Sequence, residues 1–378
     1  MLDKKAYWIG LTRVNGLGPK RFQLLMKKFG DPETVWKAKE NSLAEVLGAH
    51  SPVLRNLLEC RGSLDLTKEI INLEKNEVQV LTLEDPDYPV NLLNIHDPPP
   101  VLYIRGSLPG PDFKTMAVVG SRRATPYGKA IAEQLGYDLT ISGFVVVSGL
   151  ARGIDTCAHR GALKAKGPTI AVLGCGVDIV YPRENKGIFQ EIIESGAIIS
   201  EFPLGAPPEA RNFPARNRII SGLSLGVVVV EAAEDGGALI TADFALEQGR
   251  DVFAVPGPIT SRYSRGTNRL IKEGARLIEG VADIIEEYPL VGEYLPSKPT
   301  EQLSWPVEEP LTNLIALSEE EGVLVELLSL DPVAVDHLIT ASGLTASRVN
   351  SILMFLEMKG LVRQLPGRRY VRAGKISF

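Results

Sequence analysis

Residues Met116–Gly128, MAVVGSRRATPYG, decide the fold that this sequence predicts. An apolar run ends at Gly120, which lets a backbone approach closely, and a helix follows whose first N–H groups can receive an anion. Arg122 would add a guanidinium fork suited to a phosphate. The segment therefore predicts a strand-to-helix turn that binds an anion. A structural reading, with glycine for the turn and arginine on the surface, stays open.

Short apolar runs of the same kind alternate with helical stretches from about residue 110 onward. Six strands are predicted: Met116–Gly120, Phe144–Ser148, Thr169–Leu173, Ala197–Ser200, Val227–Glu231 and Asp251–Val255. Continuous apolar strands alternating with helices are typical of a parallel sheet covered on both faces. The sequence thus predicts an α/β, extended Rossmann-like parallel sheet domain over residues 81–287. In such a sheet the carboxyl ends of the strands form the ligand crevice.

Smaller domains are predicted on both sides of the sheet. Residues 1–80 show apolar positions at helical spacing and predict a small helical domain of the SAM or helix-hairpin-helix kind. For the Gly16–Lys20 turn we favour a plain interhelical turn, because a single Gly-x-Gly is weakly specific. An acidic, proline-rich linker is predicted at 288–317. Residues 318–378 follow a helix-turn-helix and hairpin pattern, which predicts a winged-helix domain.

The charge of the chain is unevenly distributed. The net charge is −5, which disfavours a wholly basic nucleic-acid-coating protein, so any nucleic-acid site must be a local patch. Asp283–Glu321 carries ten acidic residues against one basic residue, whereas Gly343–Phe378 carries seven basic residues against one acidic residue. The acidic segment coincides with the predicted linker and the basic segment with the predicted winged helix.

The three cysteines and the apolar runs indicate the cellular compartment. Cys60, Cys157 and Cys175 are widely spaced and form no metal-ligand pair, so reduced thiols in a cytoplasmic protein are expected. No apolar run reaches the length of a membrane span. Neither a metal nor a cofactor is predicted.

Further residues at predicted strand ends are candidates for the same crevice. Asp155 would orient an arginine or cap a helix, and His159 is expected to be packed or hydrogen-bonded rather than a catalytic base. Tyr181 and Phe213 are candidates to stack on bases, and Phe213 is equally a candidate core residue. The predicted binding residues are Gly120, Ser121, Arg122, Gly149, Arg152, Gly153, Arg183, Arg216, Asn217, Arg218 and Asn268.

Five ordered motifs carry a family resemblance between Pro86 and Ile285: Gly-Ser-Arg, Ser-Gly-x-Ala-x-Gly-Ile-Asp, Gly-x-Gly-x-Asp-x-x-Tyr-Pro, Phe-Pro-x-Arg-Asn-Arg-Ile-Ile-Ser-Gly-Leu-Ser and Val-Phe-Ala-Val-Pro-Gly. They resemble the DNA-processing protein A (DprA/Smf) family. The resemblance implies a dimeric, non-enzymatic, single-stranded-DNA-binding recombination mediator that protects incoming DNA and loads RecA during natural transformation. Single-strand-binding protein is a further partner it suggests. Gly236 departs from the serine often found there, which puts a hydroxyl contact in doubt.

Two other functions are compatible with parts of the sequence. A nucleotide-processing Rossmann enzyme of the phosphoribohydrolase type would use a similar crevice, although the Pro-Gly-Gly-x-Gly-Thr-x-x-Glu motif is absent. A winged-helix transcriptional regulator would use the basic tail but would leave the glycine-rich turns unexplained. An ATP-driven motor is disfavoured because no GxxxxGK[ST] motif occurs.

Overall fold

The computed structural model describes residues 4–110, 113–288, 318–328, 333–358, 361–365 and 367–372. These residues fall into two compact units, one within Met1–Pro296 and one within Ser297–Phe378. The predicted linker, 288–317, lies outside the described residues except for Tyr288. The described residues on both sides of position 80 share one unit, so the predicted domain boundary at residue 80 stays a prediction.

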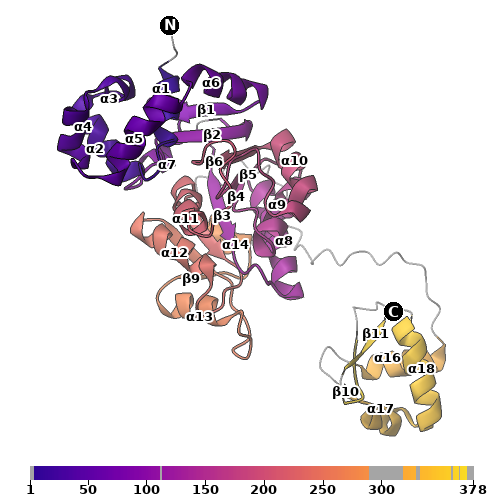
Figure 1. Ribbon diagram of the computed structural model, residues 1–378. Coiled ribbons are helices and arrows are strands. Elements are labelled where there is room, and N and C mark those ends of the chain that lie inside the picture. Colours follow the sequence, from indigo (N-terminus) through magenta and orange to yellow (C-terminus); the bar gives the residue numbers. More distant parts are fainter. Residues whose placement is uncertain are drawn as a thin grey trace. The chain divides into compact units, whose positions relative to one another are not determined.

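Helices build the first part of the larger unit (Figure 1). They are α1 (Lys5–Thr12), α2 (Pro19–Phe29), α3 (Pro32–Lys37), α4 (Glu40–Leu47), α5 (Pro52–Ser63) and α6 (Leu66–Lys75). The side chains of Asp31, Ser51 and Asp65 accept backbone N–H groups in the first turns of α3, α5 and α6, which satisfies donors that a helix start leaves free. The helical character predicted for residues 1–80 is confirmed up to the strand that begins at Gln79.

A nine-stranded sheet forms the centre of this unit, in the order β1-β2-β6-β5-β4-β3-β7-β8-β9. Its strands are β1 (Gln79–Thr82), β2 (Val101–Gly106), β3 (Thr115–Val119), β4 (Val145–Ser148), β5 (Thr169–Val172), β6 (Ala197–Ser200), β7 (Gly226–Val229), β8 (Asp251–Ala254) and β9 (Arg276–Leu277). The strands from β6 to β9 pair in parallel, whereas β1 and β2 add an antiparallel edge. All six predicted strands are confirmed, while β1, β2 and β9 were not predicted.

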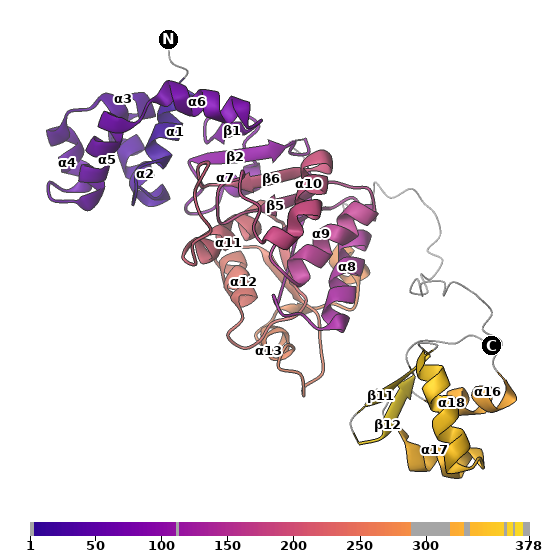
Figure 2. The same ribbon diagram turned by 45° about the vertical axis from the view of Figure 1, so that its right-hand side comes forward.

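The alternation of side chains along each strand divides the core between the two faces of the sheet. On β3, Met116 and Val118 join a cluster with α8 and α9, whereas Ala117 and Val119 join a cluster with α11 and α12. Figure 2 shows these helix pairs on different sides of the sheet. The helices that follow the sheet strands are α7 (Val90–Leu93), α8 (Pro126–Ile141), α9 (Ile154–Lys164), α10 (Lys186–Ser195), α11 (Asn212–Leu223), α12 (Gly237–Glu247), α13 (Arg265–Lys272) and α14 (Val281–Ile285).

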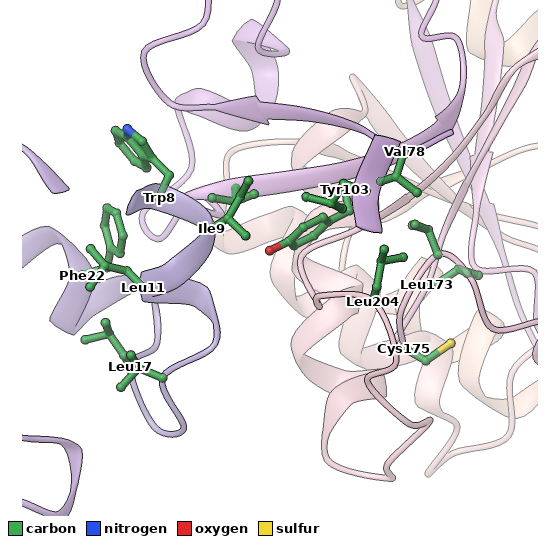
Figure 3. Packing of buried hydrophobic residues seen from close by; sticks show 14 of the residues in the cluster. Trp8, Ile9, Leu11, Leu17, Phe22, Val78, Tyr103, Leu173, Cys175 and Leu204 are labelled. Carbon is green, nitrogen blue, oxygen red and sulfur yellow. The ribbon is translucent and has the colours of Figure 1, made fainter. Parts of the chain in front are cut away.

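The N-terminal helices share a hydrophobic cluster with the edge of the sheet. Figure 3 shows Tyr103 of β2 lying between residues of the helices, such as Ile9, and sheet-side residues such as Leu204. The Tyr103 hydroxyl lies 2.7 Å from Thr12 Oγ1, and Arg13 Nη1 donates to the carbonyl of Leu204 at 3.0 Å. Strand β2 therefore links the helices to the parallel part of the sheet.

The smaller unit has the predicted winged-helix pattern. Its elements are α16 (Glu319–Leu327), β10 (Val333–Ala334), α17 (Val335–Ser342), α18 (Ala346–Met358), β11 (Val362–Leu365) and β12 (Arg369–Arg372). Ser318 and Glu321 form a capping box that starts α16, and Gly343 ends α17 with the left-handed φ of 70°. The unit has its own apolar cluster, which includes Leu324, Leu338 and Leu353.

Helices α8 and α9 pack so closely that their backbones meet at glycines. A Cβ at Gly136 would lie 2.2 Å from the carbonyl oxygen of Ala158, and one at Gly161 would lie 2.0 Å from the carbonyl oxygen of Glu133. No real side chain tolerates such distances. This contact fixes the position of α9, whose first residues lie beside the loop after β3.

We predict opposite effects for alanine at two helical glycines. Gly161→Ala should lower the free energy of unfolding by about 1–3 kcal/mol, because overpacking outweighs the gain in helix propensity. Gly62→Ala in α5, where an added Cβ would meet nothing within 4 Å, should raise it by up to about 1 kcal/mol. Urea unfolding followed by circular dichroism measures both. Equal effects would contradict the close packing of α8 on α9.

Candidate nucleic-acid interface

A cleft opens where the strand order of the parallel sheet reverses. From β3 the chain continues to β4 on one side, whereas β7 is the neighbour on the other side. The loops after β3 and β7 therefore separate, which is where open α/β sheets bind ligands. The cleft has a volume of about 700 Å³. Four arginines line it, Arg122, Arg123, Arg216 and Arg262, against one acidic residue, Asp155.

The loop after β3 supplies Gly120, Ser121 and Arg122 to the cleft, as predicted from the sequence. A Cβ at Gly120 would lie 2.5 Å from Ile154 Cγ1, so this position must be glycine for α9 to start here. The guanidinium of Arg122 lies 5.0 Å from the ring centre of Phe213, and that ring lies 5.5 Å from the ring of Tyr181. Cation and aromatic side chains thus form one continuous surface of the cleft.

Arg216 is the buried cation of the site, with 3% of its surface exposed. Its Nη1 donates to the carbonyl of Gly149 at 2.8 Å and also to that of Val172. Burial lowers the pKa of this guanidinium to about 10, and the nearby Asp155 opposes that shift. The group therefore stays charged at neutral pH. A Cβ at Gly149 would lie 2.5 Å from Arg216 Nη2, which explains the glycine.

Asp155 lies beneath this arginine in the first turn of α9. Its Oδ2 accepts the backbone N–H groups of Gly149 at 3.1 Å and Ala151 at 3.4 Å. Burial raises the pKa of its carboxyl, and Arg216 opposes that shift. The electrostatic interaction with Arg216 fits the predicted role of orienting an arginine. The predicted helix cap is wrong, because both N–H donors lie in the loop before α9 and the N-cap of α9 is Gly153.

The other predicted residues divide between the cleft and its supports. Asn217 lines the cleft, and its Nδ2 donates to the carbonyl of Gly237 at 3.4 Å. Arg152 is exposed beside the cleft and pairs with Glu184. Arg183 is exposed but does not line the cleft. Gly153 caps α9 with a φ of 79°, and a Cβ there would meet the carbonyl of Ser121 at 2.3 Å.

Arg218 and Asn268 do not line the cleft. Arg218 is buried between Glu201, at 2.5 Å, and Asp97, at 3.3 Å. Asn268 forms two hydrogen bonds with the backbone of Gly257, donating at 2.9 Å and accepting at 3.3 Å. Both residues support loops, so we leave them out of the interface proposed below.

The lining residues that the sequence analysis missed include Arg123, Arg262 and Tyr263. Arg262 lies 5.2 Å from the ring centre of Tyr263, so a second cation and aromatic pair faces the cleft. The signal was an Arg-Tyr pair soon after the Val255-Pro256-Gly257 turn. Gly236, the position that departs from the family pattern, begins α12 without a side-chain hydrogen bond.

Comparisons with known proteins match this architecture. A family model described as DNA recombination-mediator protein A matches residues 79–289, and one described as DprA winged helix domain matches residues 308–368. Protein Smf from Synechocystis is 36% identical over 401 residues, which cover 98% of this chain and 99% of that protein. The chain belongs to the DprA/Smf family. Membership gives it a DNA-processing role as a recombination mediator.

Relatives with solved structures share the fold. DNA processing protein A from Streptococcus pneumoniae has 34% identity and a TM-score of 0.65, over 76% of this chain and 98% of that one. DNA processing protein A from Helicobacter pylori, described for its single-stranded DNA binding mode, has 32% identity and a TM-score of 0.50, over 56% of this chain and 96% of that one. Both likenesses support the extended Rossmann-like fold of the family.

The start of α8 differs from a nucleotide-binding helix start. The carboxylate of Glu231 accepts the backbone N–H of Thr125 at 2.9 Å, and Thr125 Oγ1 accepts that of Gly128 at 3.1 Å. Pro126 has no N–H to offer. In dinucleotide-binding folds a pyrophosphate binds to such N–H groups. In this protein the carboxylate of Glu231 occupies the place where a nucleotide phosphate would bind.

Ser224 and His159 are of residue types that often act in catalysis, but both are buried and neither lines the cleft. Residues 222–226 match the G-x-S-x-G pattern of a nucleophile elbow, but Ser224 follows a helix and precedes a strand, the reverse of that motif. Its hydroxyl is fully buried and donates to the carbonyl of Ile220 at 2.9 Å. Across the described residues, no cluster of three or more His, Cys, Asp or Glu is placed to hold a metal.

His159 is packed and hydrogen-bonded, as predicted. It is fully buried, and its Nδ1 lies 2.7 Å from the hydroxyl of Thr169, whose proton is donated to the carbonyl of Val146. Thr169 therefore accepts, so Nδ1 carries the imidazole proton. Nε2 has no hydrogen-bond partner among the described residues. Burial lowers the pKa of His159 to about 3, so the ring stays neutral in the folded protein.

This histidine should make stability depend on acid. The unfolded chain takes up its proton near pH 6.5 and the folded chain near pH 3, so the stability that the neutral ring provides is complete above pH 6.5 and lost as pH falls between these values. His159→Asn keeps a donor for Thr169 but cannot titrate. Between pH 7 and pH 5 the variant should lose about 2 kcal/mol less unfolding free energy than the native chain. Urea titrations at both pH values measure this, and parallel losses would contradict it.

Proposed function

We propose that this recombination mediator binds single-stranded DNA in the cleft at the carboxyl ends of β3, β4 and β7. The arrangement of Arg122 and Arg216 around Phe213 and Tyr181 carries the proposal. Guanidinium groups take the phosphates, while the exposed Tyr181 ring and the half-buried Phe213 ring stack on bases that a duplex would keep paired. The relative from Helicobacter pylori, described for its single-stranded DNA binding mode, supports the same ligand.

Charge supports the proposal as well. The chain has a net charge of −5, yet the cleft contains four arginines and a single carboxylate, which is buried under Arg216. Within the described ranges, no ion pair of 4.0 Å or less involves Arg122, Arg123 or Arg262. Their charges are therefore available to phosphates, and a strand would be attracted to this patch rather than to the whole surface.

A finer role is part of the same proposal. We propose that the protein acts in the cytoplasm as a homodimer. It protects incoming single strands and loads RecA onto them, including strands that are coated by single-strand-binding protein. The proposal is supported by membership of the recombination-mediator family and by a cleft whose arginines and aromatic rings suit a nucleic-acid strand. None of the described helices combines the length and the apolar composition that a membrane span requires.

The competing enzyme of the phosphoribohydrolase type is less well supported. Such an enzyme must bind a nucleotide phosphate, and the start of α8 is occupied by Glu231. Such an enzyme also needs an acid or base directed at the glycosidic bond. Asp155 is the acidic residue that lines the cleft, but it is buried and accepts two backbone N–H groups. We therefore favour binding over catalysis.

Removing one cleft arginine tests the site. Arg122→Ala should weaken binding of an oligothymidylate on the order of tenfold and flatten the dependence of log K on log salt by about 0.7, the value for one phosphate contact on a single strand. Arg160→Ala, an exposed arginine of α9 outside the cleft, is the matched control. Fluorescence anisotropy across salt concentrations measures both. Identical curves for the two variants would place the DNA elsewhere.

Removing the winged helix tests whether the cleft is the primary site. A chain ending at Tyr288 keeps all four cleft arginines and keeps the Tyr288 ring, which lies 6.2 Å from Phe144 and 6.4 Å from Phe253. It should stay folded and retain most single-strand affinity, losing only the electrostatic contribution of the tail. Titration at matched salt measures this. If the folded truncation lost nearly all binding while residues 318–378 bound DNA tightly, the winged helix would be the primary site.

A further inference from the structure

Both ends of the loop that carries Arg122 are attached to a single residue, Glu231. The backbone carbonyl of Glu231 accepts the N–H of Ser121 at 2.7 Å. Its carboxylate accepts the N–H of Thr125 at 2.9 Å and the hydroxyl of Thr125 at 2.5 Å. Glu231 lies just after β7, the strand next to β3, so it holds this loop from the neighbouring strand end.

The carboxylate is buried, and the fold leaves space for it. Glu231 is 4% exposed, and burying a carboxylate is costly unless hydrogen bonds and nearby positive charge compensate. The start of α8 provides both, through the Thr125 donors and the positive end of the helix dipole. A Cβ at Gly128 would lie 2.3 Å from Cδ of Glu231, so only glycine admits the carboxylate in this position.

The opposite side of the loop is held by the start of α9. Ile154 donates its backbone N–H to the carbonyl of Ser121 at 3.3 Å, and Gly153 packs against the carbonyls of Ser121 and Arg122. Among the described residues no ion pair fixes Arg122. The direction of its side chain therefore depends on the loop backbone and on the ring of Phe213.

We propose that Glu231 is a positioning residue of the cleft: its backbone carbonyl binds Ser121, and its carboxylate holds the Thr125 end of the loop and thereby directs Arg122 toward Phe213 and the DNA backbone. This inference rests on the proposed function, since Arg122 is taken to contact phosphate. A negative charge near a phosphate site would by itself weaken binding. Positioning and charge therefore act in opposite directions, and variants of Glu231 separate them.

A double-mutant cycle between Glu231 and Arg122 tests the proposal. Glu231→Ala should weaken oligothymidylate binding about tenfold and reduce the salt slope by about 0.7, as Arg122→Ala does. In the Arg122→Ala chain the same change should have less than about a twofold effect, because the two residues act as a unit. Glu231→Gln keeps an acceptor for Thr125 and loses the charge, so it should bind at least as well as the native chain.

Gly128→Ala is a second variant that displaces the carboxylate without removing it. It should weaken binding in the native chain and have little effect in the Glu231→Ala chain, with circular dichroism as the folding control. If Arg122→Ala itself left affinity and salt slope unchanged, the proposed function would fail. Suppose instead that Arg122→Ala weakened binding. Only the role of Glu231 would then be overturned if Glu231→Ala had no effect, or if it weakened binding equally in the native and the Arg122→Ala chains. Weaker binding by both Glu231→Gln and Glu231→Ala would also overturn it, since the charge itself would then be required.

Discussion

The buried guanidinium of Arg216 is the interaction on which the cleft depends. It joins helix α11 to the carbonyl of Val172, at the end of β5, and to the carbonyl of Gly149, just beyond β4. A buried charge is costly unless it is paired and hydrogen-bonded. The two carbonyls and the nearby Asp155 compensate this cost, and together they fix how far α11 lies from the strand ends. The width of the cleft follows from that distance.

The glycines around this cation are consequences of the same packing. Gly149 leaves room for the Arg216 guanidinium, Gly120 for Ile154, and Gly128 for the carboxylate of Glu231. Each of these positions would force a neighbouring group to move if it carried a Cβ. The glycine-rich motifs were expected to let a phosphate approach the backbone, yet at these three positions the glycine also admits another part of the protein. The same residues therefore shape the cleft before any ligand is bound.

Sequence periodicity predicted the centre of the fold well and its edges less well. Apart from the exposed Asp251 of β8, the residues of these six strands are buried, and each strand is mainly apolar. Strand β9 has only two residues, and β1 and β2 pair antiparallel at the edge, where no strand–helix alternation identifies them. Arg262 lies in the loop after β8, and it lines the cleft only because that loop turns back toward the strand ends. No local pattern in the sequence specifies that path.

The two arginines of the Arg216-Asn217-Arg218 motif show what a motif alone leaves undecided. Because successive residues of an α-helix are separated by about 100°, residues two apart lie on nearly opposite faces. Arg216 faces the cleft, whereas Arg218 pairs with Asp97 and Glu201 on the other side. Helical geometry could have excluded a shared phosphate site for both, but it could not say which of the two faces the ligand. That choice depends on where α11 lies against the sheet, and the Arg216 hydrogen bonds to Gly149 and Val172 decide it.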